Sequence, residues 1–307
     1  MPLPLVHWTL IAALAVHSPG PVAPMGPVDS LRASIGRRIA EVKGAIVGVA
    51  FHDLATGDTL FVNADESFHA ASTMKVPVMI ELFRRIDAGG LALDQGILLV
   101  NQFGSIVDGS PYSLDAGDDS DSLAYTMIGS RVRVRDLIDH MITRSSNLAT
   151  NALIELVGAE RANATAHALG ARNIRVLRGV EDGKAFRAGL NNTTTARDLS
   201  VLMEAIETER AASGVSCSAM RDILLRQEFN SEIPAGLPKG TKVAHKTGFI
   251  TGVLHDAAIV YPAGRPPYVL VVLTKEIPEQ AVAQRLISDI SRLVYAHVSS
   301  ARGATHQ

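Results

Sequence analysis

The most informative stretch of this 307-residue chain is His69-Ala-Ala-Ser72-Thr-Met-Lys75-Val-Pro77-Val78. Apolar residues follow at helical spacing, at Met74, Val78, Ile80, Leu82, Phe83 and Ile86. Gly89-Gly90 ends the pattern, and Pro77 is tolerated because it falls within the first turn. The pattern predicts a helix with Ser72 at its N-terminus and Lys75 beside it on the same face.

The pair Ser72 and Lys75 has a chemical meaning beyond its place in a helix. A serine hydroxyl becomes a useful nucleophile when a base removes its proton, and a partly desolvated lysine can be that base. Serine and lysine at this spacing are also common on exposed helices. The interpretation therefore depends on the rest of the chain.

The composition is that of an ordinary globular protein, with 47% hydrophobic and 20% charged residues. The length suits one large domain or two closely packed ones. A net charge of −2 gives no electrostatic reason to expect nucleic acid or a membrane surface as a partner. A single cysteine, Cys217, excludes an intramolecular disulfide, and no metalloprotease, phosphate-loop or Gly-x-Ser-x-Gly motif occurs. We expect neither a metal nor an organic cofactor.

The first 26 residues resemble an export signal and a linker. The apolar run from Trp8 to Val16 is too short to span a bilayer, and a stretch rich in proline and glycine follows it. No lysine or arginine precedes the run, and no cysteine follows it to carry a lipid. We expect a periplasmic or secreted protein without stable membrane insertion.

The order of predicted elements favours an α+β fold, in which an antiparallel sheet flanked by helices is interrupted by an all-helical unit. Asp29-Ser30 is predicted to cap the first helix, and Gly248 and Gly252 to bracket a tight connection between strands. The predicted strands are 45–51, 59–62, 241–246, 255–261 and 268–274, and the predicted closing helix is 279–298. We expect residues 27–70 and 223–300 to form the sheet subdomain and residues 71–222 the helical one.

Two segments are predicted to be loops. Residues 101–130 carry Asp108, Asp115, Asp118, Asp119 and Asp121, which suits a solvated acidic loop better than a calcium loop. Tyr112 or Tyr125 could form a wall of a cleft there. Residues 178–192 show little periodicity and are predicted to be a surface loop.

Three polar motifs occur in one order: Ser72-x-x-Lys75, Ser145-Ser146-Asn147 and Lys246-Thr247-Gly248. They are separated by about 70 and about 100 residues, and each is predicted at the edge of an element. Together they make residues 28–298 resemble the class A β-lactamase and penicillin-binding-protein superfamily of active-site serine hydrolases. The second motif departs from the family's Ser-Asp-Asn because its middle residue is Ser146.

The resemblance implies a role for each motif residue. Ser72 would attack a β-lactam carbonyl and form an acyl-enzyme, and Lys75 would take or relay its proton. Ser145 would pass a proton to the leaving nitrogen. Asn147 would hold the side-chain amide of the substrate, and Lys246 and Thr247 its carboxylate. The oxyanion would lie between the backbone N–H groups of Ser72 and Phe249.

The resemblance also implies that a glutamate in the loop 178–192 activates the water that hydrolyses the acyl-enzyme. Glu181 is the only glutamate in that loop. It stands three residues after Arg178, where the family pattern has two, and Ala185 occupies the place of the family's asparagine. Asn191 or Asn192 could substitute for that asparagine. A solvated loop carboxylate is the alternative role for Glu181.

Three functions stay open at this point. A serine β-lactamase is favoured by Glu181, and a penicillin-binding protein or D,D-peptidase acting on peptidoglycan peptides is the alternative. A non-enzymatic sensor is disfavoured because the catalytic side chains are retained. We expect a monomer that acts on a small-molecule β-lactam or a peptidoglycan peptide. His245 or His255 could contact the substrate carboxylate, but strand histidines are more often structural, and Asp256 is expected to be a structural partner.

Overall fold

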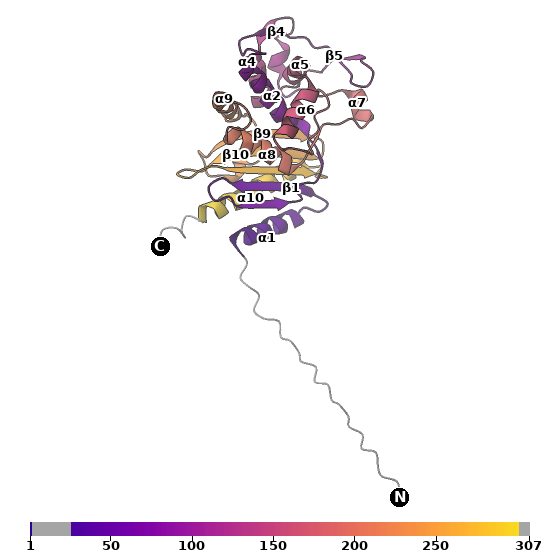
Figure 1. Cartoon of the computed structure of the whole chain (residues 1–307). Helices are drawn as coiled ribbons and strands as arrows, with labels where there is room; N and C mark the ends of the chain where they lie inside the picture. The colour runs from indigo at the N-terminus through magenta and orange to yellow at the C-terminus, as the bar shows by residue number, and fades with distance from the viewer. Residues whose placement is uncertain (2–25, 301–307) are drawn as a thin grey trace.

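The computed structural model describes residue 1 and residues 26–300 (Figure 1). The predicted export segment, with its apolar run from Trp8 to Val16, lies outside the described residues. Within the described residues, no helix is long and apolar enough to cross a membrane.

A five-stranded antiparallel sheet forms the centre of the molecule, in the order β2-β1-β11-β10-β9. The first strand of the chain pairs with the last, with Ile46 opposite Lys275. The predicted sheet with strands from both ends of the chain is confirmed. Its strands are β1 (Ile46–Asp53), β2 (Thr59–Val62), β9 (Lys242–Ile250), β10 (Val253–Tyr261) and β11 (Tyr268–Lys275).

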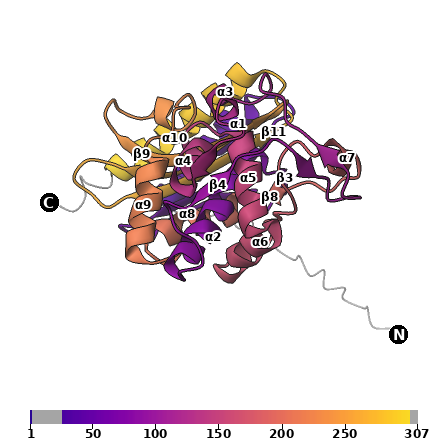
Figure 2. The same ribbon diagram turned by 90° about the horizontal axis from the view of Figure 1, so that it is seen from above.

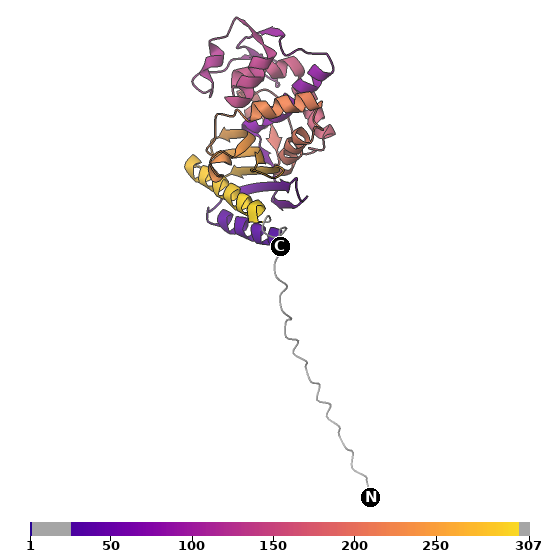
Figure 3. The ribbon, with the colours of Figure 1, turned by 90° about the vertical axis from the view of Figure 1, so that its left-hand side faces the viewer.

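The two faces of the sheet belong to two hydrophobic cores because side chains alternate along each strand. In β11, Val271 faces one core and Val272 the other. The outer core includes the buried faces of α1 (Pro27–Ala40) and α10 (Gln280–Ser300). Figure 3 shows these two helices together on the outer side of the sheet.

Helices cover the inner face and extend away from it (Figure 1). They are α2 (Lys75–Asp87), α3 (Ser122–Tyr125), α4 (Val134–Thr143), α5 (Asn147–Val157), α6 (Ala159–Ala168), α7 (Gly183–Arg187), α8 (Ala196–Glu207) and α9 (Gly214–Leu224), with 3₁₀ turns η1 (Ala71–Met74) and η2 (Pro234–Gly236). Seen from above, α7 and α9 lie at opposite edges of the molecule (Figure 2). The predicted α+β architecture is confirmed, and the exact division at residues 71 and 222 stays a prediction.

Six short strands pair within the helical region and its junction with the sheet. They are β3 (Phe68–His69) with β8 (Thr193–Thr194), β4 (Gly96–Leu98) with β7 (Arg131–Arg133), and β5 (Phe103–Gly104) with β6 (Pro111–Tyr112). The pair β3–β8 places the residues just before Ser72 beside the end of the loop 178–192. Two segments far apart in sequence therefore meet next to the serine.

Two predicted boundaries are wrong for local physical reasons. Helix α1 begins at Pro27 with Gly26 as its N-cap, so Asp29 and Ser30 lie in its first turn instead of capping it. Proline is favoured there because its fixed φ suits a first helical residue. Strand β9 continues through the motif Lys246-Thr247-Gly248 to Ile250, so Gly248 is not part of the turn. Thr251 and Gly252 make the turn, and Gly252 has φ of 75°.

Candidate active site

Ser72 lies on η1, a 3₁₀ turn that leads into α2, and not on the α-helix that the sequence predicts. The residue before it, Ala71, has φ of 43°, a left-handed conformation that costs energy for a residue with a Cβ. The backbone N–H of Ala71 donates to Nδ1 of His69 over 3.0 Å. This turn presents the half-buried Ser72 side chain, which makes no hydrogen bond within residues 26–300.

Strand β9 runs directly beside this turn. A Cβ at Gly248 would lie 3.1 Å from the backbone nitrogens of Ser72 and Thr73 and 3.2 Å from Cβ of Ala71. Such contacts are too close for a side chain without movement of the backbone. Glycine in the third motif therefore allows β9 and the serine turn to approach, with the following residue, Phe249, at the mouth of the site.

Lys75 is fully buried, and its ammonium group points at the second motif. Its Nζ lies 2.6 Å from the carbonyl oxygen of Ser145, 3.1 Å from Oγ of Ser145 and 2.9 Å from Oδ1 of Asn147. Burial lowers the pKa of Lys75 to about 7, against the opposing effects of the carboxylates of Asp119 and Glu181. The lysine is therefore poised to exchange a proton near neutral pH.

Ser145 lies between two buried lysines. Nζ of Lys246 is 3.0 Å from Oγ of Ser145, which also contacts Lys75. Burial and then the neighbouring Lys75 hold the pKa of Lys246 well below its usual range. Two like charges that share one hydroxyl destabilise each other, so this arrangement favours transfer of a proton through Ser145.

The second motif is fixed by caps at the start of α5. Oγ of Ser146 accepts a hydrogen bond from the backbone N–H of Ala149, so the serine that replaces the family's aspartate acts as an N-cap. Oδ2 of Asp119 accepts from the backbone N–H groups of Asn147 and Leu148, at 2.9 and 3.0 Å. A carboxylate at a helix N-terminus is favourable because of the helix dipole.

The prediction that the aspartates of residues 101–130 are simply solvated is therefore wrong for two of them. Asp119 and Asp121 are buried, and Asp121 pairs with His140 on α4. Asp118 remains exposed, as predicted. Within the described residues, no group of three or more His, Cys, Asp or Glu side chains is placed to hold a metal ion.

Glu181 faces the serine site. Nδ2 of Asn147 donates to Oε1 of Glu181 over 2.6 Å, and Glu181 lines the same cavity as Ser72. Its φ of 61° is left-handed, which marks a constrained loop position. Partial burial raises the pKa of Glu181, against the opposing hydrogen bond from Asn147.

The loop that carries Glu181 is anchored, and not the plain surface loop that the sequence predicts. Asn151 on α5 binds the backbone of Val180 twice, accepting at 2.7 Å and donating at 3.1 Å. A Cβ at Gly179 would lie 2.5 Å from Oδ1 of Asn151, so a larger residue there would displace the side chain that holds Val180. Asn151 is not predicted from the sequence as a site residue, although it lies one helical turn after Asn147.

Asn191 and Asn192 do not take the place of the missing asparagine beside Glu181. Both bind Arg178 instead: Oδ1 of Asn191 accepts from its guanidinium, and Asn192 contacts its backbone N–H and carbonyl groups. They close the base of the loop. Ala185 is buried inside it, in α7.

Residues 101–118 pack against this loop and hold its far side. Asp182 accepts from Oγ of Ser105 and from the backbone N–H of Ile106, each at 2.9 Å. The hydroxyl of Tyr112 donates to the carbonyl of Val180, and that of Tyr125 to Asp119. Neither tyrosine lines the cavities at Ser72, so the predicted cleft wall is wrong.

Two adjoining cavities meet at Ser72, with volumes of about 830 and 250 Å³. Ser72, Asn147 and Phe249 line both. The larger cavity extends along Glu181, and the smaller one contains Ser145 and Thr247. Six of the sequence-predicted site residues therefore line one continuous cleft, while Lys75 and Lys246 are buried behind it and contact Ser145.

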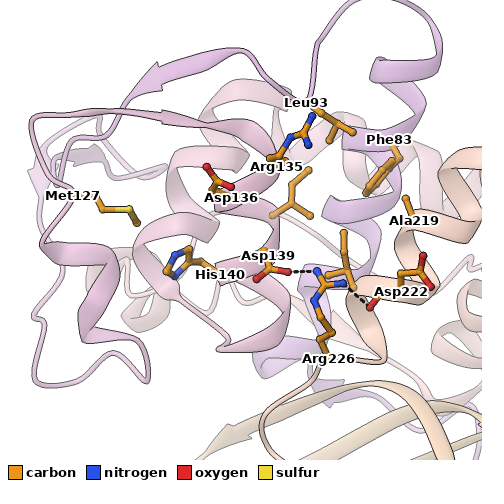
Figure 4. Close-up of a pocket in the computed structure, with 12 residues that line it drawn as sticks. Phe83, Leu93, Met127, Arg135, Asp136, Asp139, His140, Ala219, Asp222 and Arg226 are labelled. Atoms are coloured by element: carbon orange, nitrogen blue, oxygen red, sulfur yellow. Dashed lines mark hydrogen bonds and ion pairs between the residues drawn. The ribbon is translucent and has the colours of Figure 1, made fainter.

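A third cavity of about 610 Å³ lies elsewhere, between α2, α4 and α9. Figure 4 shows Arg226 at its edge, where it contacts Asp139 and the carbonyl of Asp222. No residue of the three motifs lines this cavity.

Similarity to known proteins extends over most of the chain. The "Beta-lactamase enzyme family" profile matches residues 30–298. The chain belongs to this β-lactamase family. A β-lactamase of Streptomyces lavendulae is 29% identical over 271 residues, which are 85% of this chain and 83% of that protein.

Solved structures of the β-lactamase family and of PBP-A share the fold. The β-lactamase of Sphaerobacter thermophilus has a TM-score of 0.76 and 30% identity, and the match covers 88% of this chain and 98% of that one. PBP-A has a TM-score of 0.78 and 29% identity, and the match covers 91% of this chain and 100% of that one. The chain is thus similar both to β-lactamases and to PBP-A.

In this member of the β-lactamase family, neither candidate histidine reaches the cleft. His245 is completely buried and contacts Asp256 over 2.9 Å, while Asp256 also accepts from the backbone N–H of Ile233. His255 is also completely buried, and its Nε2 lies 2.8 Å from the carbonyl of His69. Burial lowers the pKa of His255 to about 4, so its ring is neutral at neutral pH. Both histidines are structural, and Asp256 is the partner of His245.

Proposed function

We propose that this chain is a class A serine β-lactamase that opens the β-lactam amide through an acyl-enzyme on Ser72. The observation that carries the proposal is the continuous cleft in which Ser72, two buried lysines linked by Ser145, and Glu181 come together. Its β-lactamase relatives, which match over more than four fifths of the chain, support the same substrate class.

In the acylation step, Oγ of Ser72 attacks the β-lactam carbonyl as neutral Lys75 takes its proton. The C–N bond then breaks, and the nitrogen receives a proton from Ser145, which is resupplied from a neighbouring lysine. The contacts of Ser145 with both lysines support this route. The backbone N–H groups of Ser72 and Phe249 stabilise the oxyanion, a kind of interaction that is typically worth about two to three powers of ten in rate.

Substrate binding uses polar side chains of the second and third motifs. The ammonium of Lys246 and the hydroxyl of Thr247 bind the substrate carboxylate as charge-assisted donors. Asn147 holds the side-chain amide, from a position already fixed by Asp119. For deacylation, Glu181 accepts a proton from a water that attacks the ester, and its raised pKa suits a general base better than that of an ordinary glutamate.

A D,D-peptidase-like penicillin-binding protein is the second candidate. It is favoured by the match to the whole length of PBP-A, of which a variant has been solved as an acyl-enzyme complex with penicillin G. The departures around Glu181 favour it too, because Ala185 stands where the family has an asparagine. In that case, acylation would proceed and hydrolysis would be slow.

The pH dependence of hydrolysis tests the proposal. A base must be neutral to accept a proton, so kcat/KM for a penicillin should rise with pH through the Lys75 pKa of about 7 and then level off. Lys75→Arg should abolish this rise and most of the activity. Turnover of a D-alanyl-D-alanine peptide together with negligible penicillin hydrolysis across the pH range would establish the second candidate instead.

We also propose that the protein is exported and acts as a monomer. Export predicts that the N-terminal sequence of the protein recovered from the periplasm or medium begins after the apolar run that ends at Val16. Recovery of the intact N-terminus from the cytoplasm alone would contradict export. Light scattering that gives twice the mass of the mature chain would contradict the monomer.

A further inference from the structure

The smaller cavity at Ser72 contains a carboxyl group that the proposed mechanism does not use. Glu232 lines this cavity together with Ser145 and Thr247, and its residue surface is 3% exposed. A carboxyl group is unusual in a buried position unless a cation or several donors satisfy it.

Glu232 is poorly satisfied. Its Oε1 accepts from Nε2 of Gln284 over 3.3 Å, and its Oε2 has no hydrogen-bond partner among the described residues. Among the described residues, Glu232 also forms no ion pair with an N···O distance of 4.0 Å or less. The group therefore lacks the cation that normally accompanies a buried carboxylate.

Charged and polar groups on three neighbouring elements surround Glu232. Strand β9 contributes His245 and Lys246, β10 contributes Asp256, and α10 contributes the neutral Gln284. Burial raises the pKa of Glu232, and the Asp256 carboxylate raises it further. Above that pKa the ionised Glu232 makes the cavity wall negative.

No lysine, arginine or histidine side chain lines this cavity, and Lys246 reaches it only through its contact with Ser145. Besides Glu232, the lining consists of the exposed Asp118, of neutral hydroxyl and carboxamide side chains, and of the apolar Phe229, Phe249 and Leu254. A substrate carboxylate held by Lys246 and Thr247 would thus lie beside a negative wall. A positive charge next to that carboxylate would complement the wall.

We propose that Glu232 is a specificity-determining residue. It favours β-lactams that carry a positive charge on the substituent next to their carboxylate, on the side of the leaving nitrogen. The proposal rests on the proposed β-lactamase function. The attraction acts through space in a partly desolvated cleft, so it requires no direct contact with the buried Oε2.

The test compares two cephalosporins with the same thienylacetyl side chain. One carries a neutral acetoxymethyl group at C3, and the other a cationic pyridiniummethyl group. The wild type should prefer the cationic compound in kcat/KM by about tenfold, mainly through KM. Glu232→Gln should reduce the ratio of the two kcat/KM values to near the value set by the intrinsic reactivity of the two compounds. Glu232→Lys should reverse the preference, so that the neutral compound has the higher kcat/KM.

A matched control removes the same charge at Glu279, which is exposed just before α10. Glu279→Gln should leave the ratio unchanged, whereas an equal change in both variants would indicate general surface charge and overturn the proposal. The ratio should also fall in the wild type as the pH is lowered through the Glu232 pKa. Lowering the pH also protonates Lys246, whose charge repels the cationic group, so the same pH series on Glu232→Gln shows how much of the fall belongs to Glu232.

The outcomes separate this proposal from the function on which it rests. If neither cephalosporin is hydrolysed, the β-lactamase function fails. If both are hydrolysed with a ratio that Glu232→Gln and Glu232→Lys do not change, the role of Glu232 is wrong while the β-lactamase function stands.

Discussion

Replacement of Ser72 by alanine is expected to lower kcat for β-lactam hydrolysis by at least about 10⁴-fold, because it removes the hydroxyl on which the proposed acyl-enzyme forms. The Ser72 side chain makes no hydrogen bond within residues 26–300, so the folded state should be unaffected. Thermal unfolding should therefore be the same for Ser72→Ala and the wild type, while mass spectrometry detects no adduct with penicillin.

Ser113→Ala provides the control, since Ser113 is exposed and lines neither cavity at Ser72. It should retain wild-type kinetics. A penicillin adduct on the Ser72→Ala protein would mean that another residue is the nucleophile.

Glu181→Gln is expected to separate the two halves of the reaction. Glutamine has the same shape and can still accept the hydrogen bond from Nδ2 of Asn147, but it cannot take a proton from water. Acylation should continue, while kcat should fall by about 10²- to 10⁴-fold, the usual contribution of a general base. The acyl-enzyme of Glu181→Gln should therefore persist long enough for its mass to be measured.

Glu160→Gln on α6 carries the same change of charge at an exposed position outside both cavities. It should behave as the wild type. Undiminished steady-state turnover by Glu181→Gln would exclude Glu181 from the hydrolytic step.

The sequence predicts the sheet, the helix after Ser72 and the closing helix because their signals are local. Strand alternation and the glycines after α2 can be recognised within a few residues. The conformation at Ser72 could not be predicted in this way. The left-handed Ala71 and the 3₁₀ turn lie against β9, about 170 residues further on, where Gly248 allows the close approach.

The roles of the side chains also divide into those that local sequence reveals and those that depend on contacts between distant residues. The three motifs identify which residues meet, but Lys75 points at Ser145 and Asn147, a contact across about 70 residues that helical spacing cannot reveal. In sequence, Asp119 is indistinguishable from its acidic neighbours, and only its contacts with the start of α5 set it apart. Glu232 carries no motif at all, and its importance appears only from its burial beside Thr247.

The transient kinetics of the wild type with a chromogenic cephalosporin test the central claim most directly. We expect sustained hydrolysis at the rates typical of enzymes, above about 1 s⁻¹. It should follow a burst of about one equivalent of product as Ser72 is acylated, or be linear from the start if deacylation is faster than acylation. A burst of one equivalent followed by almost no further product would contradict it. That result would mean that Glu181 does not activate water and that the chain is a penicillin-binding relative.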